Sequence, residues 1–225
     1  MDKTELEALV NEAVRDADLC PDEIPAIDLY LDQITSLMSD KLAEGSERFR
    51  DRVLTKTMIN NYSKDGLISP VKGKKYTKEQ ILQMLLVYSM KNTLSIGEIK
   101  RILQNVYALP DFDGKMLEEI YLRFLEIKES ERAQMNTLID RFVESNGLDI
   151  CDDADFFTVI LGLSALSSYL KNTVQALLEA RYPDVDAEKA RREDLKRQKE
   201  EKKAAKAAKA DGSQKTDVSE GERSV

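Results

Sequence analysis

Apolar residues recur at intervals of three to four positions through most of the first 183 residues, which is the spacing of one face of an α-helix. The segment 24–45 shows the pattern with Ile27, Leu31, Ile34, Leu37, Met38 and Leu42. Shorter patterns cover 6–14, 55–65, 78–92 and 95–107, and longer ones cover 115–144 and 154–181. No alternating stretch of more than a few residues indicates a strand. The pattern therefore predicts an all-α protein.

Polar residues and glycine mark where several of these helices begin and end. Thr55 stands before one helix, and Gly66 follows it, as a residue that readily adopts the left-handed conformation at a helix end. Thr77–Gln80 and Ser95–Glu98 have the spacing of a capping box. We therefore expect short helices that are joined by short turns.

The two longest patterns raise separate questions. The first is interrupted by the polar residues KESERAQ at 128–134, which predicts a break in the helix near Ser130. The second contains the longest apolar run, FFTVILGLSALSSYL at 156–170. This run has 15 residues and three serines, whereas a membrane span needs about 18 residues. We expect a buried helix there, paired with the preceding helix, and no membrane segment.

The composition excludes several classes of chemistry. Histidine is absent, and the two cysteines, Cys20 and Cys151, lie far apart, so neither Ser–His or Cys–His catalysis nor a disulfide framework is indicated. No Gly-rich phosphate loop is visible. The acidic residues of two loops are expected to be helix caps or loop acids, with cation binding as the alternative: Asp111, Asp113, Asp152, Asp153 and Asp155. The start MDKTELEALV lacks the features of a secretory signal. We expect a cytoplasmic protein that is not an enzyme and that needs no cofactor or metal.

The net charge of -8 conceals a strongly basic segment. Residues 1–47 have a net charge of -10 and residues 102–183 of -7, whereas residues 48–101 have +8. Residues 184–225 have +1 and almost no large apolar side chain, so we expect a charged and mostly disordered tail. Because phosphate contacts need Lys or Arg, nucleic acid is expected at 48–101.

A set of residues within 54–103 carries a resemblance to a known family. Its parts are the helix end Tyr62, Gly66 and Leu67, the proline-containing turn 70–75, the helix start Tyr76-Thr77, and the motif Leu94, Ser95, Glu98, Ile99, Lys100, Ile102 and Leu103. This order resembles the start of the MerR-like winged helix-turn-helix family. With the acidic helix IDLYLDQI in front, it also resembles an uncharacterised bacterial family of unknown function.

The MerR resemblance implies a recognition helix in the major groove and a wing on the DNA backbone. The candidate DNA-binding residues precede the recognition helix, lie on it, or belong to the wing and the next helix start: Arg48, Arg50, Arg52, Lys56, Asn60, Asn61, Lys64, Lys72, Lys74, Lys75 and Lys78. Asn60 and Asn61 stand where that family usually has an arginine and a second tyrosine, and asparagine can pair with adenine.

The predicted organisation has four regions. Residues 1–23 form an amphipathic arm, 24–109 a MerR-like winged helix-turn-helix, 110–183 a helical region that dimerises or senses an unknown effector, and 184–225 the tail. The predicted function is sequence-specific binding of double-stranded DNA by a homodimeric transcriptional regulator.

Alternatives to this prediction stay open. The apolar helices of 110–183 could fold back on the winged domain in a monomer. The chain could be a protein-interaction adaptor whose acidic segments cover the basic face, or a ligand- or stress-sensing helical protein without a nucleic-acid partner.

Overall fold

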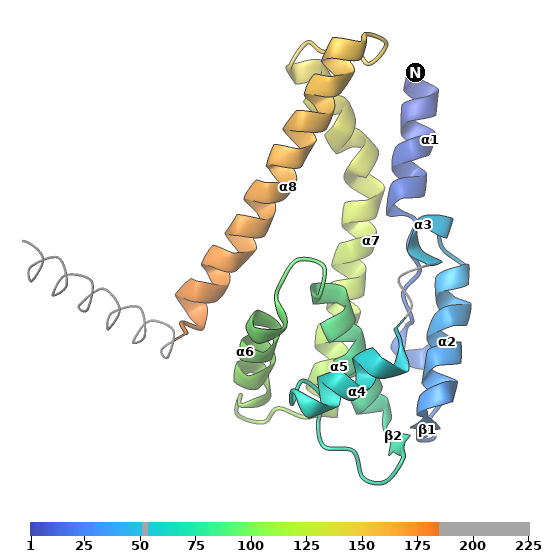
Figure 1. Ribbon diagram of the computed structural model, residues 1–225, viewed down its shortest axis with the longest axis vertical. Helices are drawn as coiled ribbons and strands as arrows, with labels where there is room; N and C mark the ends of the chain where they lie inside the picture. The colour runs from blue at the N-terminus through green and yellow to red at the C-terminus, as the bar shows by residue number, and fades with distance from the viewer. Residues whose placement is uncertain (51–53, 185–225) are drawn as a thin grey trace, which may run out of the picture. The chain divides into compact units, whose positions relative to one another are not determined.

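The computed structural model describes residues 1–50 and 54–184, and Met1–Tyr182 forms one compact unit (Figure 1). Its elements are α1 (Lys3–Val14), the 3-10 turn η1 (Pro21–Glu23), β1 (Leu29–Tyr30), α2 (Leu31–Ala43), α3 (Glu47–Arg50), α4 (Lys56–Lys64), β2 (Lys75–Tyr76), α5 (Lys78–Met90), α6 (Ile96–Tyr107), α7 (Gly114–Ser145) and α8 (Asp153–Arg181). Helices thus make up most of the described chain, which confirms the all-α prediction. The tail predicted beyond residue 184 lies outside the described residues.

Side-chain caps begin the central helices where the sequence indicated. Thr55 Oγ1 accepts a hydrogen bond from the backbone N–H of Met58 (3.2 Å) at the start of α4. The capping boxes Thr77–Gln80 and Ser95–Glu98 both form, at the starts of α5 and α6. Gly66 follows α4 with a φ of 71°, in the left-handed region that residues with a Cβ rarely adopt. These observations confirm the helix boundaries predicted between residues 55 and 98.

Acidic residues of two loops also cap helices, as predicted. Asp113 Oδ1 accepts from the N–H of Met116 (2.9 Å) and begins α7. Asp152 Oδ1 accepts from the N–H groups of Ala154 (2.9 Å) and Asp155 (3.0 Å) and begins α8. In the described ranges, no group of three or more His, Cys, Asp or Glu side chains could hold a metal ion.

A two-residue antiparallel pairing closes the loop that follows α4. Leu29 of β1 lies opposite Tyr76 of β2, and Tyr30 lies opposite Lys75. The pairing holds the end of this loop against the start of α2. Neither strand was predicted, because two residues are too few to show an alternating pattern.

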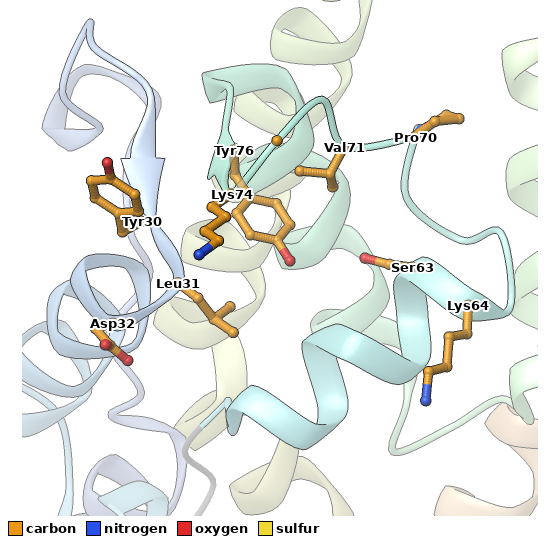
Figure 2. Close-up of a pocket in the computed structure, with 10 residues that line it drawn as sticks. Tyr30, Leu31, Asp32, Ser63, Lys64, Pro70, Val71, Lys74 and Tyr76 are labelled. Atoms are coloured by element: carbon orange, nitrogen blue, oxygen red, sulfur yellow. The ribbon is translucent and has the colours of Figure 1, made fainter.

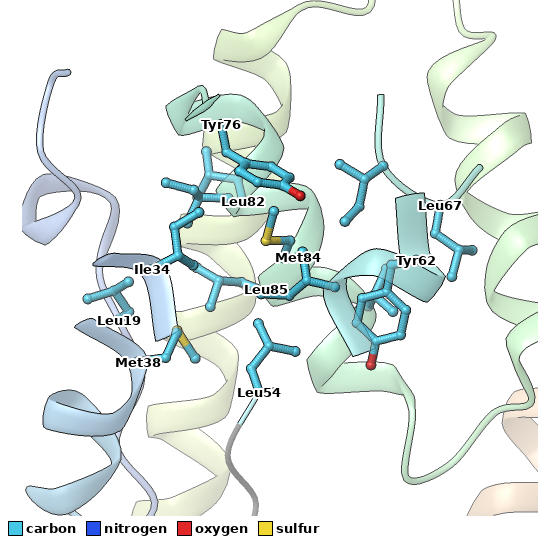
Figure 3. Close-up of a cluster of buried hydrophobic side chains, with 14 of the residues drawn as sticks. Leu19, Ile34, Met38, Leu54, Tyr62, Leu67, Tyr76, Leu82, Met84 and Leu85 are labelled. Carbon is cyan, nitrogen blue, oxygen red and sulfur yellow. The ribbon is translucent and has the colours of Figure 1, made fainter. Parts of the chain in front are cut away.

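The hydrophobic core lies between α2, α4, α5, α6 and the first part of α7 (Figure 3). α5 is its central element, since seven of its thirteen residues are buried. One residue from each surrounding helix is completely buried: Ile34, Ile59, Ile99 and Leu117. Burying one such side chain stabilises the fold by about 1.5–3 kcal/mol. The core thereby fixes α4 and the start of α5, between which the basic loop extends.

α7 runs through the polar stretch 128–134 without interruption, so the predicted break near Ser130 is wrong. Lys128 contacts the carboxylates of both Asp16 and Asp18, the latter at 2.6 Å. Arg132 Nη2 donates to Asp16 Oδ1 at 2.7 Å. The polar residues therefore mark an ion-paired contact with the segment after α1, and the helix continues.

Replacing Asp16 by Asn is expected to lower the free energy of unfolding by about 1–2 kcal/mol at neutral pH, because Lys128 and Arg132 lose a charged, half-buried partner. Burial alone would raise the pKa of Asp16, but hydrogen bonds and charges from Lys128 and Arg132 outweigh it and hold the pKa below the ordinary value of an aspartate. A depressed pKa contributes stability that is complete above the unfolded-state pKa and is lost as the pH falls through the folded-state pKa. Urea unfolding at about pH 6 and about pH 2.5 measures this contribution.

The difference between wild type and Asp16→Asn should shrink at the lower pH. Asp40→Asn is the matched control, because Asp40 is exposed on α2, and it should leave the unfolding energy unchanged at both pH values. A difference for Asp16→Asn that stays constant would contradict the ion-pair explanation.

α8 packs against α7 near its own start and against α6 near its end. Gly162 allows the first contact, because a Cβ at this position would overlap the ring of Phe142 on α7. At the other end, Arg101 Nη2 donates to Glu179 Oε1 at 2.6 Å. None of the helices in the described part of the chain is both long and apolar enough to cross a membrane.

Candidate nucleic-acid interface

α4 has one buried face and one exposed polar face. Ile59 and Tyr62 pack into the core, and burial raises the pKa of the Tyr62 phenol. The residues on the other side are all exposed and none is acidic: Lys56, Thr57, Asn60, Asn61 and Lys64. A firmly packed helix therefore presents amide and ammonium groups, which are the groups that pair with base edges and phosphates.

The loop after α4 and the first residue of β2 place three further lysines beside this helix. Lys72, Lys74 and Lys75 are exposed, and Lys72 and Lys74 form no ion pair with any described residue. The Lys75 ammonium lies 5.0 Å from the centroid of the Tyr30 ring on β1, which is a cation–π contact. From 55 to 76 the chain has five lysines and one aspartate, so this stretch is basic although the whole chain is acidic.

Two buried glutamines of α5 hold the base of the loop. Gln83 is 1% exposed; its Oε1 accepts from the Ser69 N–H (2.7 Å) and its Nε2 donates to Ser69 Oγ (2.9 Å). Gln80 Nε2 donates to the carbonyls of Ser69 and Pro70, both at 3.1 Å. Gln80 Oε1 also accepts from the Thr77 N–H (2.9 Å). The loop thus leaves and rejoins the core at fixed points.

A cleft of about 600 Å³ separates the loop from α4 (Figure 2). It is lined by Tyr30, Leu31 and Asp32 from the β1–α2 junction, Ser63 and Lys64 from α4, and Pro70, Val71, Gly73, Lys74 and Tyr76 from the loop and β2. Lys64 and Lys74 come from its two opposite walls. Apolar walls between two ammonium groups suit the sugar–phosphate backbone of a nucleic-acid strand.

Two of the predicted DNA-binding lysines already contact carboxylates. Lys56 contacts Asp32 at the start of α2, and Lys78 Nζ donates to Glu118 Oε1 of α7 at 3.0 Å. The Lys56–Asp32 pair is exposed, and exposed ion pairs contribute about 0–1 kcal/mol, so a phosphate can replace that carboxylate at little cost. The Lys78–Glu118 pair is half-buried.

Of the predicted arginines, Arg48 lies apart from the lysines. Arg48 is in α3, which follows the C-terminal end of α2 and packs against it, whereas β1 and the basic loop adjoin the N-terminal end. The 13 residues of α2 span about 18 Å. Arg50 is the last residue of α3, and Arg52 lies outside the described residues. The structure therefore brings the residues of α4 together with the loop lysines, but it does not bring Arg48 to them.

The tyrosines of this region have buried or half-buried rings. Tyr62 and Tyr76 are 5% and 7% exposed and belong to the hydrophobic core. Tyr88 is half-buried, and the Lys91 ammonium lies 4.3 Å from the centroid of its ring.

The role of Gln83 was not predicted. The sequence did contain one signal for it: Gln83 is a polar residue within the apolar stretch 81–87. A polar side chain that is buried in such a helix needs a hydrogen-bond partner. The pattern could not name Ser69 as that partner, since the contact depends on how the loop returns to α5.

Residues 19–124 match the family described as Domain of unknown function (DUF1836). The match covers α2 to α6, the small sheet and the first part of α7. Its two ends meet in the core, because the Tyr121 hydroxyl donates to the carbonyl of Leu19 at 3.1 Å. No curated protein and no solved structure matches the chain. The comparisons thus bear out the resemblance to an uncharacterised domain family, and the candidate interface lies within the matched residues.

Proposed function

We propose that this protein is a sequence-specific DNA-binding protein and a transcriptional regulator, built on a MerR-like winged helix-turn-helix. In this proposal α2 and α4 are the two helices of the motif, and the turn 70–75, which ends at the first residue of β2, is the wing. The observation that carries the proposal is the exposed amide and ammonium face of α4 beside three exposed loop lysines, all attached to one core.

Each part has a defined role. α4 enters the major groove, where Asn60 or Asn61 pairs with the N6 and N7 positions of adenine. Lys72, Lys74 and Lys75 contact phosphates, and Lys64 with Lys74 holds the backbone that passes along the cleft. The hydrogen bonds from Gln80 and Gln83 keep the wing in place before DNA arrives, which reduces the entropy lost on binding.

The contacts of the acidic N-terminal segment favour this function over an adaptor with a covered basic face. Asp16 and Asp18 pair with Lys128 and Arg132 of α7 and not with the lysines of α4 or the wing. In the described chain, only Lys56 among the basic residues of α4 and the wing contacts a carboxylate. The basic face is therefore largely open to a phosphate backbone.

The test is binding of the full-length protein to random duplex DNA across a salt series. The logarithm of the binding constant should fall linearly with the logarithm of salt concentration, with a slope of about -0.9 for each phosphate contacted. Replacing Lys72, Lys74 and Lys75 by Glu should make this slope shallower by about 2.7 and weaken binding on the order of tenfold or more at low salt. Fluorescence anisotropy measures both quantities.

Replacing Lys115, Arg123 and Arg141 of α7 by Glu is the matched control, since these exposed residues undergo the same charge change on another element. It should leave the slope unchanged. Asn60→Ala with Asn61→Ala should abolish the preference for duplexes selected from a random pool and keep the salt slope. Absence of binding by the wild type at about 50 mM salt would refute the proposal and leave the adaptor function.

A further inference from the structure

The cleft between α4 and the basic loop contains two hydroxyl groups that have no protein partner. The Tyr76 side chain is 7% exposed, and its hydroxyl forms no hydrogen bond with any residue that the structure describes. Ser63 Oγ is buried and also lacks a partner among those residues. Both side chains point into the cleft, one from α4 and the other from β2 (Figure 2). Because buried polar groups are nearly always hydrogen-bonded, this pair indicates a site for a molecule that completes the bonds.

Apolar side chains form the walls around these hydroxyls. Leu31 comes from the start of α2, and Pro70 and Val71 come from the loop. The volume of about 600 Å³ lies within the range of ordinary small-molecule sites, about 300–1,000 Å³. A nucleotide base has an apolar face for such walls and an edge with donors and acceptors. A hydroxyl group both donates and accepts, so the hydroxyl pair suits the edge of a base.

Two ammonium groups add positive charge to the cleft. Lys64 and Lys74 line its opposite walls, and neither forms an ion pair with a described residue. Asp32 also lines the cleft, but its carboxylate contacts Lys56. A phosphate monoester carries a charge of about -1.5 to -2 at neutral pH, whereas a carboxylate carries a single charge. The two ammonium groups therefore match a monophosphate better than a carboxylate.

We propose that this cleft binds a free nucleoside 5′-monophosphate. The base lies between the apolar walls with its edge at the hydroxyls of Ser63 and Tyr76, and the phosphate lies between Lys64 and Lys74. A DNA duplex offers the cleft only its backbone, because its bases are stacked and paired. The backbone uses the lysines but leaves the two buried hydroxyls without partners, whereas a free nucleotide satisfies all four groups.

The bound nucleotide regulates DNA binding. The ammonium groups that hold its phosphate are the ones that hold the DNA backbone in the cleft, so the two ligands compete. This regulation rests on the proposed function, whereas nucleotide binding itself does not. The effector site is then on the DNA-binding face and not in the helical region 110–183.

Isothermal titration calorimetry of the full-length protein with AMP, GMP, CMP and UMP tests the site. We expect at least one of the four to bind with a dissociation constant below about 1 mM. The matching nucleoside without its phosphate, and inorganic phosphate alone, should each bind at least about tenfold more weakly, because each lacks one set of contacts.

Variants that remove one hydroxyl test the role of the buried pair. Tyr76→Phe and Ser63→Ala should each weaken nucleotide binding about 3–10-fold. Tyr76→Phe should leave urea unfolding unchanged, because the hydroxyl that it removes has no partner in the described chain. Tyr169→Phe is the matched control, since it removes an exposed hydroxyl on α8 and should leave nucleotide binding unchanged.

Two lysines of the same loop test where the phosphate lies. Lys74→Gln should weaken nucleotide binding about tenfold, because it removes a charged partner of the phosphate. Lys72→Gln removes the same charge from a residue that does not line the cleft. It should change nucleotide binding by no more than about twofold, since solvent and salt screen exposed charges that are not in contact.

Competition with fluorescent duplex DNA tests the regulation. The nucleotide that binds best should lower the anisotropy of the DNA complex, whereas sodium sulfate at equal ionic strength should lower it less. Tyr76→Phe should require about 3–10-fold more nucleotide for the same release, because its cleft binds the nucleotide more weakly. Wild-type protein that holds both ligands at once would refute the regulation.

Two results would overturn the nucleotide site. The first is that none of the four nucleotides binds at about 1 mM. The second is binding that Tyr76→Phe and Ser63→Ala leave unchanged, or that Lys72→Gln weakens as much as Lys74→Gln does. Nucleotide binding without DNA binding would refute the proposed function alone, and DNA binding without nucleotide binding would refute this site alone.

Discussion

Tyr121→Ala is expected to lower the free energy of unfolding by about 3–5 kcal/mol, because it empties the space of an aromatic ring in the core and removes a buried hydrogen bond. Tyr121 is 2% exposed, and its hydroxyl donates to the carbonyl of Leu19 at 3.1 Å. Its ring centroid lies 6.0 Å from that of Phe124. A loss of this size is a large part of the stability of an ordinary domain. Urea unfolding followed by circular dichroism measures it.

Tyr121→Phe separates the two contributions. It keeps the ring and leaves the Leu19 carbonyl without its donor, so we expect a loss of about 1–2 kcal/mol. Tyr169→Ala is the control, because this exposed tyrosine of α8 should change the unfolding energy by no more than about 0.5 kcal/mol. A loss below about 1 kcal/mol for Tyr121→Ala would show that α7 is not integral to the core around α5.

Gln83→Leu is expected to lower the free energy of unfolding by about 2–3 kcal/mol, although leucine suits an apolar helix. Leucine fills similar space but leaves the backbone N–H and the hydroxyl of Ser69 without their partner, and an unsatisfied buried group costs about 1–3 kcal/mol. Amide hydrogen exchange of Ser69 should accelerate more than that of residues within α5, since the base of the loop opens first.

The same variant also tests the link between the loop and DNA. If the loop is the wing, Gln83→Leu should weaken DNA binding although it removes no charge, because the lysines at 72, 74 and 75 lose their fixed frame. Gln104→Leu is the control, since Gln104 is exposed on α6, and it should change neither stability nor binding. Unchanged exchange at Ser69 in Gln83→Leu would refute the anchoring role.

Local sequence determined most of the helices of this protein. Thr77 with Gln80 and Ser95 with Glu98 form their capping boxes because the groups involved lie within one turn of helix, so no distant contact is needed. Gly66 ends α4 for an equally local reason, its positive φ. The net charge of each segment likewise identified the basic stretch 48–101. The exposed residues of α4 could also be predicted, because helical spacing places them on the side opposite Ile59 and Tyr62.

Only the tertiary structure decided the features that depend on residues far apart in the chain. The polar stretch around Ser130 suggests a helix end, yet α7 continues, and only the folded chain brings its Lys128 and Arg132 to Asp16 and Asp18. The β1–β2 pairing and the Gln83–Ser69 contact depend on where the loop returns. Capping boxes and glycine turns are stabilised by residues that are close in the sequence, so the sequence alone predicts them. The pairings named here are stabilised by contacts that exist only after the chain has folded.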